Sequence, residues 1–172
     1  MHRTLRSISV LMLIVAHSAA FAGVDRPPIK IAVFDFELED VTPAAAFDGK
    51  STSSASNLQK VGVEAREMLA KSGRYSIIDA STVQATPVLM KSLRNCEGCE
   101  AAIALALGAE QSMMGVITRV TQTDYYVQVQ IRNCRTGKVL DEQEANFAGG
   151  DDGWASGVRM LIKHQILVGA DP

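Results

Sequence analysis

Three cysteines are the most reactive side chains in this chain of 172 residues. Cys96 and Cys99 form a CxxC pair that encloses Glu97 and Gly98, and Cys134 stands apart from them. In an oxidising compartment the pair predicts a small-loop disulfide, because a glycine inside the loop lets the turn close. Cys134 is either a free thiol or the true partner of Cys96 or Cys99, so three single pairings stay open.

The CxxC pair also fits an alternative function, that of a thiol-disulfide redox or metal-handling protein. A helix that begins at Cys99 would lower the pKa of a thiol through its dipole. The three thiolates lack an obvious fourth metal ligand, since His164 is the only histidine outside residues 1–22. Attachment of c-type haem needs CxxCH, and position 100 is Glu. The prediction is therefore no cofactor and no metal.

No group of residues has the spacing of a catalytic site. The sequence has no nucleophile elbow and no glycine-rich phosphate loop after a strand, so no enzyme is predicted. Asp35, Glu37 and Glu39 are expected to share one side of a strand, and a hard cation could use their oxygens. The loop spacing and glycine of a calcium site are missing, which favours a solvated strand end.

The first 22 residues have the pattern of a secretory signal peptide. A basic start, an apolar run and a small-residue end follow in the order that a signal requires, at Arg3 and Arg6, Ile8–Ala16, and Ala20–Ala22. No cysteine lies near the cut, so a lipid-modified N-terminus is not expected. The predicted product is periplasmic or secreted.

A single globular domain is predicted over residues 23–172, with a core over about 30–168. The chain has 17 Lys and Arg against 19 Asp and Glu and no basic cluster, which excludes nucleic acid as a partner. No second apolar stretch approaches the length of a membrane span, so none is expected in the mature protein.

Hydrophobic periodicity predicts a strand-helix-strand-helix-helix order, followed by a three-strand meander and a last helix. This is a mixed sheet of about five strands with helices packed on it, an α/β or α+β fold. Tyr125, Val127, Val129 and Ile131 alternate with polar residues, which predicts one buried face. The expected elements are strand 30–39, loop 40–56, a helix from Asn57 to Gly73, strand 74–79, a broken helix 81–92, helix 99–107, strands 111–120, 125–132 and 138–147, and helix 154–168.

The stretches AKSGRYSIID, LGAEQSMMGVITRV and YYVQVQIRNCRTGKVL resemble the amino-terminal domain of TolB and the periplasmic domain of curli secretion channel proteins. More closely, IAVFDFELED, NCEGCEAAIALALGAE and GDDGWASGVRMLI are similar to a proteobacterial family of exported proteins with a domain of unknown function. The resemblance covers about Ile31–Leu167. It implies a TolB-like fold and a protein-interaction module without catalysis. The β-propeller that follows this domain in TolB is missing, so a Tol-Pal role is not implied.

These observations together predict a periplasmic, non-enzymatic accessory module whose partner is an envelope or periplasmic protein. The partner is expected to add a strand at an open edge formed by 138–147, or to contact the loop 40–56. Trp154 is expected either to anchor the core or to contribute to the partner surface. The residues of the predicted surface are Lys138, Val139, Asp141 and Trp154.

Overall fold

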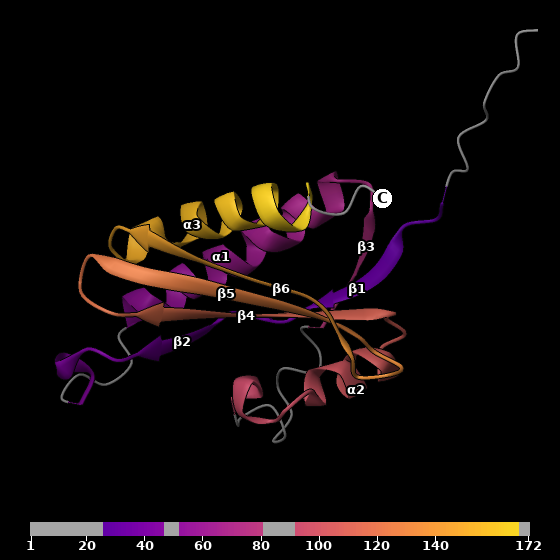
Figure 1. The fold of residues 1–172 in the computed structure, drawn as a ribbon, viewed down its shortest axis with the longest axis horizontal. Coiled ribbons are helices and arrows are strands. Elements are labelled where there is room, and N and C mark those ends of the chain that lie inside the picture. Colours follow the sequence, from indigo (N-terminus) through magenta and orange to yellow (C-terminus); the bar gives the residue numbers. More distant parts are fainter. Residues whose placement is uncertain (1–25, 47–51, 81–91, 169–172) are drawn as a thin grey trace, which may run out of the picture.

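A computed structural model describes residues 26–46, 52–80 and 92–168. It contains a mixed sheet with helices on both faces (Figure 1). The elements in chain order are β1 (Ile29–Val33), β2 (Glu37–Asp40), η1 (Pro43–Ala46), α1 (Thr52–Lys71), β3 (Tyr75–Ile78), η2 (Leu93–Asn95), α2 (Cys99–Ala106), β4 (Gln111–Arg119), β5 (Asp124–Asn133), β6 (Val139–Ala148), η3 (Asp151–Gly153), α3 (Trp154–Leu161) and the π-helical turn η4 (Ile162–Ile166).

The strand order in the sheet is β3-β1-β4-β5-β6, and β2 pairs with β4. The pairings of β1 with β3, β1 with β4 and β2 with β4 are parallel, whereas β4, β5 and β6 form an antiparallel meander. The predicted mixed sheet and three-strand meander are therefore confirmed. The predicted broken helix 81–92 lies outside the described residues except for Ser92, and the predicted signal peptide 1–22 lies outside them entirely.

The first predicted strand, 30–39, is two strands in the structure. Val33 pairs with Met113 and Glu37 pairs with Val116, so residues 34–36 face only residues 114–115. The extra residue interrupts the ladder as a β-bulge does. It also shifts the alternation of side chains, which is why Ile31 and Val33 before it and Phe36 after it all pack in the same core.

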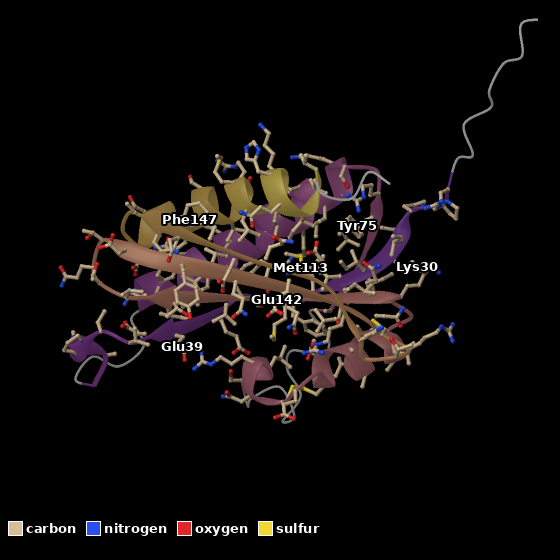
Figure 2. The ribbon with its side chains drawn as sticks, viewed as in Figure 1. Lys30, Glu39, Tyr75, Met113, Glu142 and Phe147 are labelled. Carbon is tan, nitrogen blue, oxygen red and sulfur yellow. A yellow bond between two sulfur atoms is a disulfide. The ribbon has the colours of Figure 1, made fainter. Side chains whose placement is uncertain are left out.

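The larger core lies between the sheet and the helices α1 and α3, which cover the same face (Figure 1). The apolar positions predicted for β5 are buried there, as are Val61, Ala65 and Leu69 of α1. Figure 2 shows Phe147 on this side of the sheet and Glu39 on the opposite side. The amphipathic helices predicted from the three-and-four spacing are thus confirmed.

Helix α1 begins at Thr52, five residues before the predicted start. The prediction of a loop over 40–56 was wrong for its last residues, because their small polar side chains give no apolar period. Ser54 is 4% exposed, and its hydroxyl donates to Asp151 Oδ2 at 2.9 Å. A polar contact rather than a hydrophobic stripe therefore holds the first turn in place.

Among the described residues, the elements on the opposite face of the sheet are η2 and α2, at one end (Figure 1). A smaller core lies beneath them and contains Ala32, Phe34, Leu93, Ala104 and Cys134. The rest of this face displays polar residues of β5 and β6. None of the helices in the described part of the chain is both long enough and apolar enough to span a membrane.

Candidate functional site

Cys96 and Cys99 form a disulfide with a Cα–Cα distance of 5.5 Å. Gly98 lies between them with φ of +104°, a conformation that glycine adopts without strain. Cys134 is the free cysteine and is 4% exposed. Of the three pairings that the sequence left open, the structure contains the CxxC pairing. A thioredoxin-type motif would lie directly after a central strand of the sheet, whereas this pair follows η2.

The buried thiol of Cys134 is poorly suited to reaction. Burial raises its pKa; the neighbouring Ser112 hydroxyl acts in the opposite direction, and the charge of Glu100 adds to the rise. Because the thiolate is the nucleophilic form, a raised pKa lowers the reactivity of the sulfur.

Glu100 lies beside the disulfide and is 2% exposed. Its Oε1 is 2.9 Å from Nε of Arg132 on β5, and its Oε2 has no hydrogen-bond partner among the described residues. One carboxylate oxygen of Glu100 and the two sulfurs all lie within 4.8 Å of one another. This arrangement places a buried acid against a pair of sulfurs.

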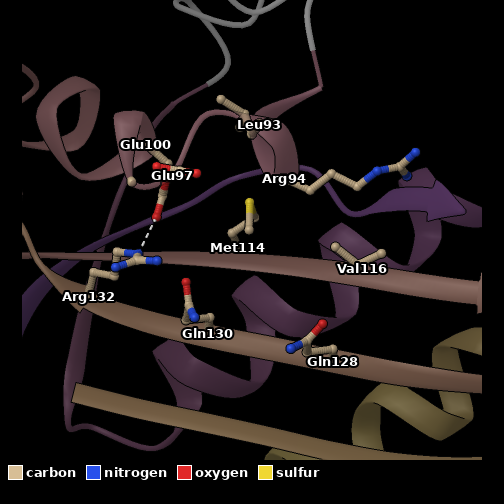
Figure 3. Close-up of a pocket in the computed structure, with 10 residues that line it drawn as sticks. Leu93, Arg94, Glu97, Glu100, Met114, Val116, Gln128, Gln130 and Arg132 are labelled. Carbon is tan, nitrogen blue, oxygen red and sulfur yellow. Dashed lines mark ion pairs between the residues drawn. The ribbon is translucent and has the colours of Figure 1, made fainter. Parts of the chain in front are cut away.

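A cavity of about 270 Å³ adjoins this cluster, between the segment from Leu93 to Glu100 and strands β4 and β5 (Figure 3). Met114 and Val116 form an apolar wall, and Gln128 and Gln130 form a polar one. In Figure 3 the sulfur of Met114 points toward the segment that carries Leu93. The cavity therefore gives access to the region around Glu100 from the open face of the sheet.

The acidic residues of the first predicted strand do not form a shared site. Asp35 is bound by Arg66 of α1, with Nη1 of the arginine 3.2 Å from Oδ1 of the aspartate. Glu37 accepts hydrogen bonds from the Ser92 hydroxyl and the Leu93 N–H, and Glu39 accepts one from Thr118. Each carboxylate has its own partner, so the alternative of a cation bound by all three loses its basis.

Lys138, Val139 and Asp141 lie at the start of β6 or directly before it. Lys138 and Val139 are exposed, whereas Asp141 is half-buried and accepts a hydrogen bond from the Gln143 amide at 2.7 Å. β6 is an edge of the sheet, as predicted, since no further strand pairs with it among the described residues.

The placement of Trp154 on a partner surface was wrong. Trp154 is 1% exposed and packs edge-on against Tyr125, with the Arg119 guanidinium 5.3 Å from its ring centroid. The indole at the first residue of α3 is part of the core between the helices and the sheet, where close packing makes a large buried side chain stabilising. The other position predicted for Trp154, that of a core anchor at the start of the helix, is confirmed.

The backbone groups of β6 alternate between the sheet and the open edge. Gly149 N–H donates to Thr123 C=O at 2.7 Å, next to the terminal pair Asp124 and Ala148 of the ladder. Hydrogen-bonded and non-hydrogen-bonded pairs alternate in antiparallel sheets. The odd-numbered residues from 141 to 147 therefore point their N–H and C=O toward β5. Those of Glu142, Glu144 and Asn146 point outward.

A family model matches residues 29–166 of the chain. The chain belongs to the DUF3280 family. The family is described as "Protein of unknown function (DUF2380)", which confirms the expected membership of a family of unknown function. No curated protein matches the chain.

Solved structures share the fold of this DUF3280 protein. Lipoprotein GNA1162 from Neisseria meningitidis is 16% identical with a TM-score of 0.54, over 84% of this chain and 100% of that one. The PelC dodecamer from Paraburkholderia phytofirmans is 12% identical with a TM-score of 0.50, over 79% and 86%. TolB from Acinetobacter baumannii is 17% identical with a TM-score of 0.46, over 83% of this chain and 29% of TolB.

Sequence reasoning found the disulfide and the edge strand but missed Glu100 and its ion pair with Arg132. Glu100 directly follows Cys99, and a charged residue inside the alanine-rich stretch 99–107 is the one signal that could have drawn attention to it. The partner that compensates its charge lies 32 positions further along the chain, so spacing alone does not reveal the pair.

Proposed function

We propose that this protein is a non-enzymatic accessory module of the bacterial envelope that binds a partner protein by strand addition to β6. The observation that carries the proposal is the open edge itself. β6 has ten residues, and no further strand pairs with it among the described residues. A row of outward N–H and C=O groups forms a template for an extended segment of another chain.

The charges on β6 favour a partner other than a second copy of this chain. Glu142 and Glu144 are exposed and lie on the same face of the strand. In a two-fold symmetric pairing of two β6 edges, each patch meets its own copy, which brings carboxylates close to carboxylates. Like charges opposite one another destabilise a strand pair. A different protein, with other side chains at these positions, fits better.

Two further observations support a location in the envelope. Residues 1–22 have the pattern of a secretory signal, and the Cys96–Cys99 disulfide is of a kind that persists in oxidising compartments. Among proteins with this fold, GNA1162 is named a lipoprotein and PelC a dodecamer. Because the fold occurs in the PelC dodecamer, it is compatible with binding to other protein chains, which supports a binding role for this protein.

The absence of catalysis is supported by the way in which charged side chains are used in the described part of the chain. Arg119 binds Asp40 at 2.6 Å and Asp151 at 2.5 Å, and Arg159 binds Glu64 at 2.6 Å. These ion pairs join separate elements of the fold. They hold helices and strands together, which is a structural use of charged side chains.

The test compares two substitutions at a single outward-facing position. Glu144→Pro removes one outward N–H donor but leaves the hydrogen bonds between β5 and β6 in place, because proline is tolerated at an edge. Glu144→Ala removes the same carboxylate and retains the N–H. Each protein is used to capture partners from an envelope extract. We expect a protein that wild type and Glu144→Ala retain to be lost with Glu144→Pro.

The matched backbone control is Gln143→Pro, whose N–H points toward β5. This change should lower the free energy of unfolding, whereas Glu144→Pro should leave it nearly unchanged. If Glu144→Pro, still folded, retains the same partners as Glu144→Ala, strand addition at β6 is refuted.

A further inference from the structure

The cluster of Cys96, Cys99 and Glu100 has no role in the proposed edge. Cys96 follows η2, and Cys99 and Glu100 are the first two residues of α2, so the cluster lies where η2 and α2 cover the sheet and not at the outer edge of β6. Its three ligand-type atoms lie within 4.8 Å of one another, a spacing over which one ion can reach all of them after small movements. Thiolate and carboxylate are both ligands of Zn²⁺.

Glu100 supplies a second observation, independent of the cysteines. Its side chain is 2% exposed, yet Oε2 has no hydrogen-bond partner among the described residues. A buried carboxylate oxygen without a donor is unfavourable, because it has lost its hydrogen bonds to water and gained none in return. A cation beside this carboxylate would remove that penalty, and the two sulfurs lie within 4.8 Å of one of its oxygens.

We propose that reduction of the Cys96–Cys99 disulfide creates a site for a thiophilic divalent cation such as Zn²⁺. The ligands are the two thiolates and the Glu100 carboxylate. Cys99 is the first residue of α2, an eight-residue helix, and the N-terminal dipole of that helix stabilises its thiolate. The oxidised protein lacks the site, because sulfurs joined in a disulfide are poor ligands.

The charges around the site balance. Two thiolates and one carboxylate carry three negative charges, and the cation together with the Arg132 guanidinium supplies three positive ones. Arg132 already binds Glu100 through Oε1 at 2.9 Å, which orients the carboxylate as an outer partner of a metal ligand does. The fourth position of a tetrahedral cation remains open toward solvent or the neighbouring cavity.

Formation of the site requires a dithiol reductant. Two electrons from the dithiol break the S–S bond between Cys96 and Cys99, and the dithiol becomes a disulfide in turn. The two protons of the dithiol pass to the sulfurs of Cys96 and Cys99, which become thiols. Binding of the cation then forms two metal–sulfur bonds and releases these two protons to solvent.

The test titrates the purified protein with Cd²⁺ after reduction and removal of the reductant under anaerobic conditions. Cadmium thiolates absorb in the ultraviolet, so binding through sulfur is seen directly. We expect one equivalent to bind to reduced wild type and none to the oxidised protein. Glu100→Gln should weaken binding at least about tenfold, because loss of a ligand should cost no less than loss of a group that only orients one.

Two matched controls test whether a nearby acid or the third thiol contributes to Cd²⁺ binding. Glu97→Gln removes an acid from the same loop that does not belong to the cluster, and Cys134→Ala removes the third thiol; both should bind Cd²⁺ as wild type does. X-ray absorption of the wild-type cadmium complex gives a second measurement that does not depend on any variant folding. We expect two sulfur ligands. A third sulfur, equal affinity in Glu100→Gln, or no binding by the reduced wild type would overturn the proposal.

Discussion

The ring of Phe36 occupies the space directly over Gly115, where any other residue would place its side chain. A Cβ built on Gly115 would lie 2.2 Å from Cε1 of Phe36. Phe36 is 3% exposed, so the ring has little room to move away. Gly115 lies in the middle of β4, opposite Val129 of β5. Glycine weakens a strand interior, but here it lets a large ring pack against the backbone.

Gly115→Ala should therefore destabilise the protein by about 1–3 kcal/mol, the usual effect of overpacking a core. Phe36→Leu should also be destabilising, since it leaves part of the space empty. Their combination should lose less than the sum, because the smaller side chain gives room for the new methyl group. Urea unfolding of the four proteins measures this coupling; additive losses would show that Phe36 does not restrict position 115.

The same contact explains why one predicted strand became two. Phe36 reaches the large core only because residues 34–36 contain one residue more than the facing segment of β4. A run of β-branched and aromatic residues gives the same sequence signal with or without this insertion. Gly115, which leaves room for the Phe36 ring in the core, is nearly 80 positions away in the chain. Asp35, Glu37 and Glu39 were therefore assigned to one side, although the structure gives them separate partners.

Elements with a strong period of their own were predictable. The alternation from Tyr125 to Ile131 predicted both the strand and its buried face, because successive side chains of a strand point to opposite faces of the sheet. The disulfide also followed from local spacing. The ion pair of Glu100 depends on a tertiary neighbour, Arg132, and the choice between the two positions predicted for Trp154 depends on another, Tyr125. Sequence spacing carries no information about such neighbours.

The carboxylate of Asp40 should make stability depend on pH. Partial burial acts to raise its pKa, but hydrogen bonds from Thr42 and the ion pair with Arg119 outweigh burial and hold the pKa below its usual value. Because the folded pKa is lower than the unfolded one, this contribution is present above the ordinary aspartate range and is lost as the pH falls through the folded pKa.

Asp40→Asn should lower the free energy of unfolding at neutral pH by about 1–2 kcal/mol, since it removes hydrogen bonds to a charged group. The variant should also lose less stability than wild type when the pH falls from 6 to 3. Urea unfolding at the two pH values measures the difference. Glu144→Gln, which removes an exposed carboxylate, is the control; an identical pH dependence for wild type and Asp40→Asn would contradict the assignment.

Thiol counting should distinguish Cys134 from the disulfide-bonded pair. The Cys134 sulfur is buried and its pKa is raised by that burial, so a thiol reagent should label no cysteine in the native, non-reduced protein. Unfolding without reductant should expose one thiol, and unfolding with reductant all three cysteines. Peptide mapping of the non-reduced protein should find Cys96 joined to Cys99. Labelling of Cys96 or Cys99 before reduction would show that another pairing is populated.

The side chains of β6 predict the charge pattern of the segment that pairs with it. Glu142 and Glu144 project from one face of β6 and are exposed, and both Gln128 and Gln130 donate amide hydrogens to Glu142 from the neighbouring strand. A strand added outside β6 would place every second side chain beside these carboxylates. Opposite charges at such cross-strand positions stabilise by about 0.2–1 kcal/mol per pair.

An extended peptide with lysine at every second position should therefore bind more tightly than the same peptide with glutamate there. The two favourable pairs alone amount to about a two- to thirtyfold ratio of Kd values, and repulsion of the glutamate peptide should increase it. The ratio should shrink as salt is added, because exposed charges are screened. Glu142→Gln together with Glu144→Gln should remove the preference without unfolding the protein. Equal binding of the two peptides to wild type at low salt would show that these carboxylates do not select the partner, even if β6 is the edge to which it adds.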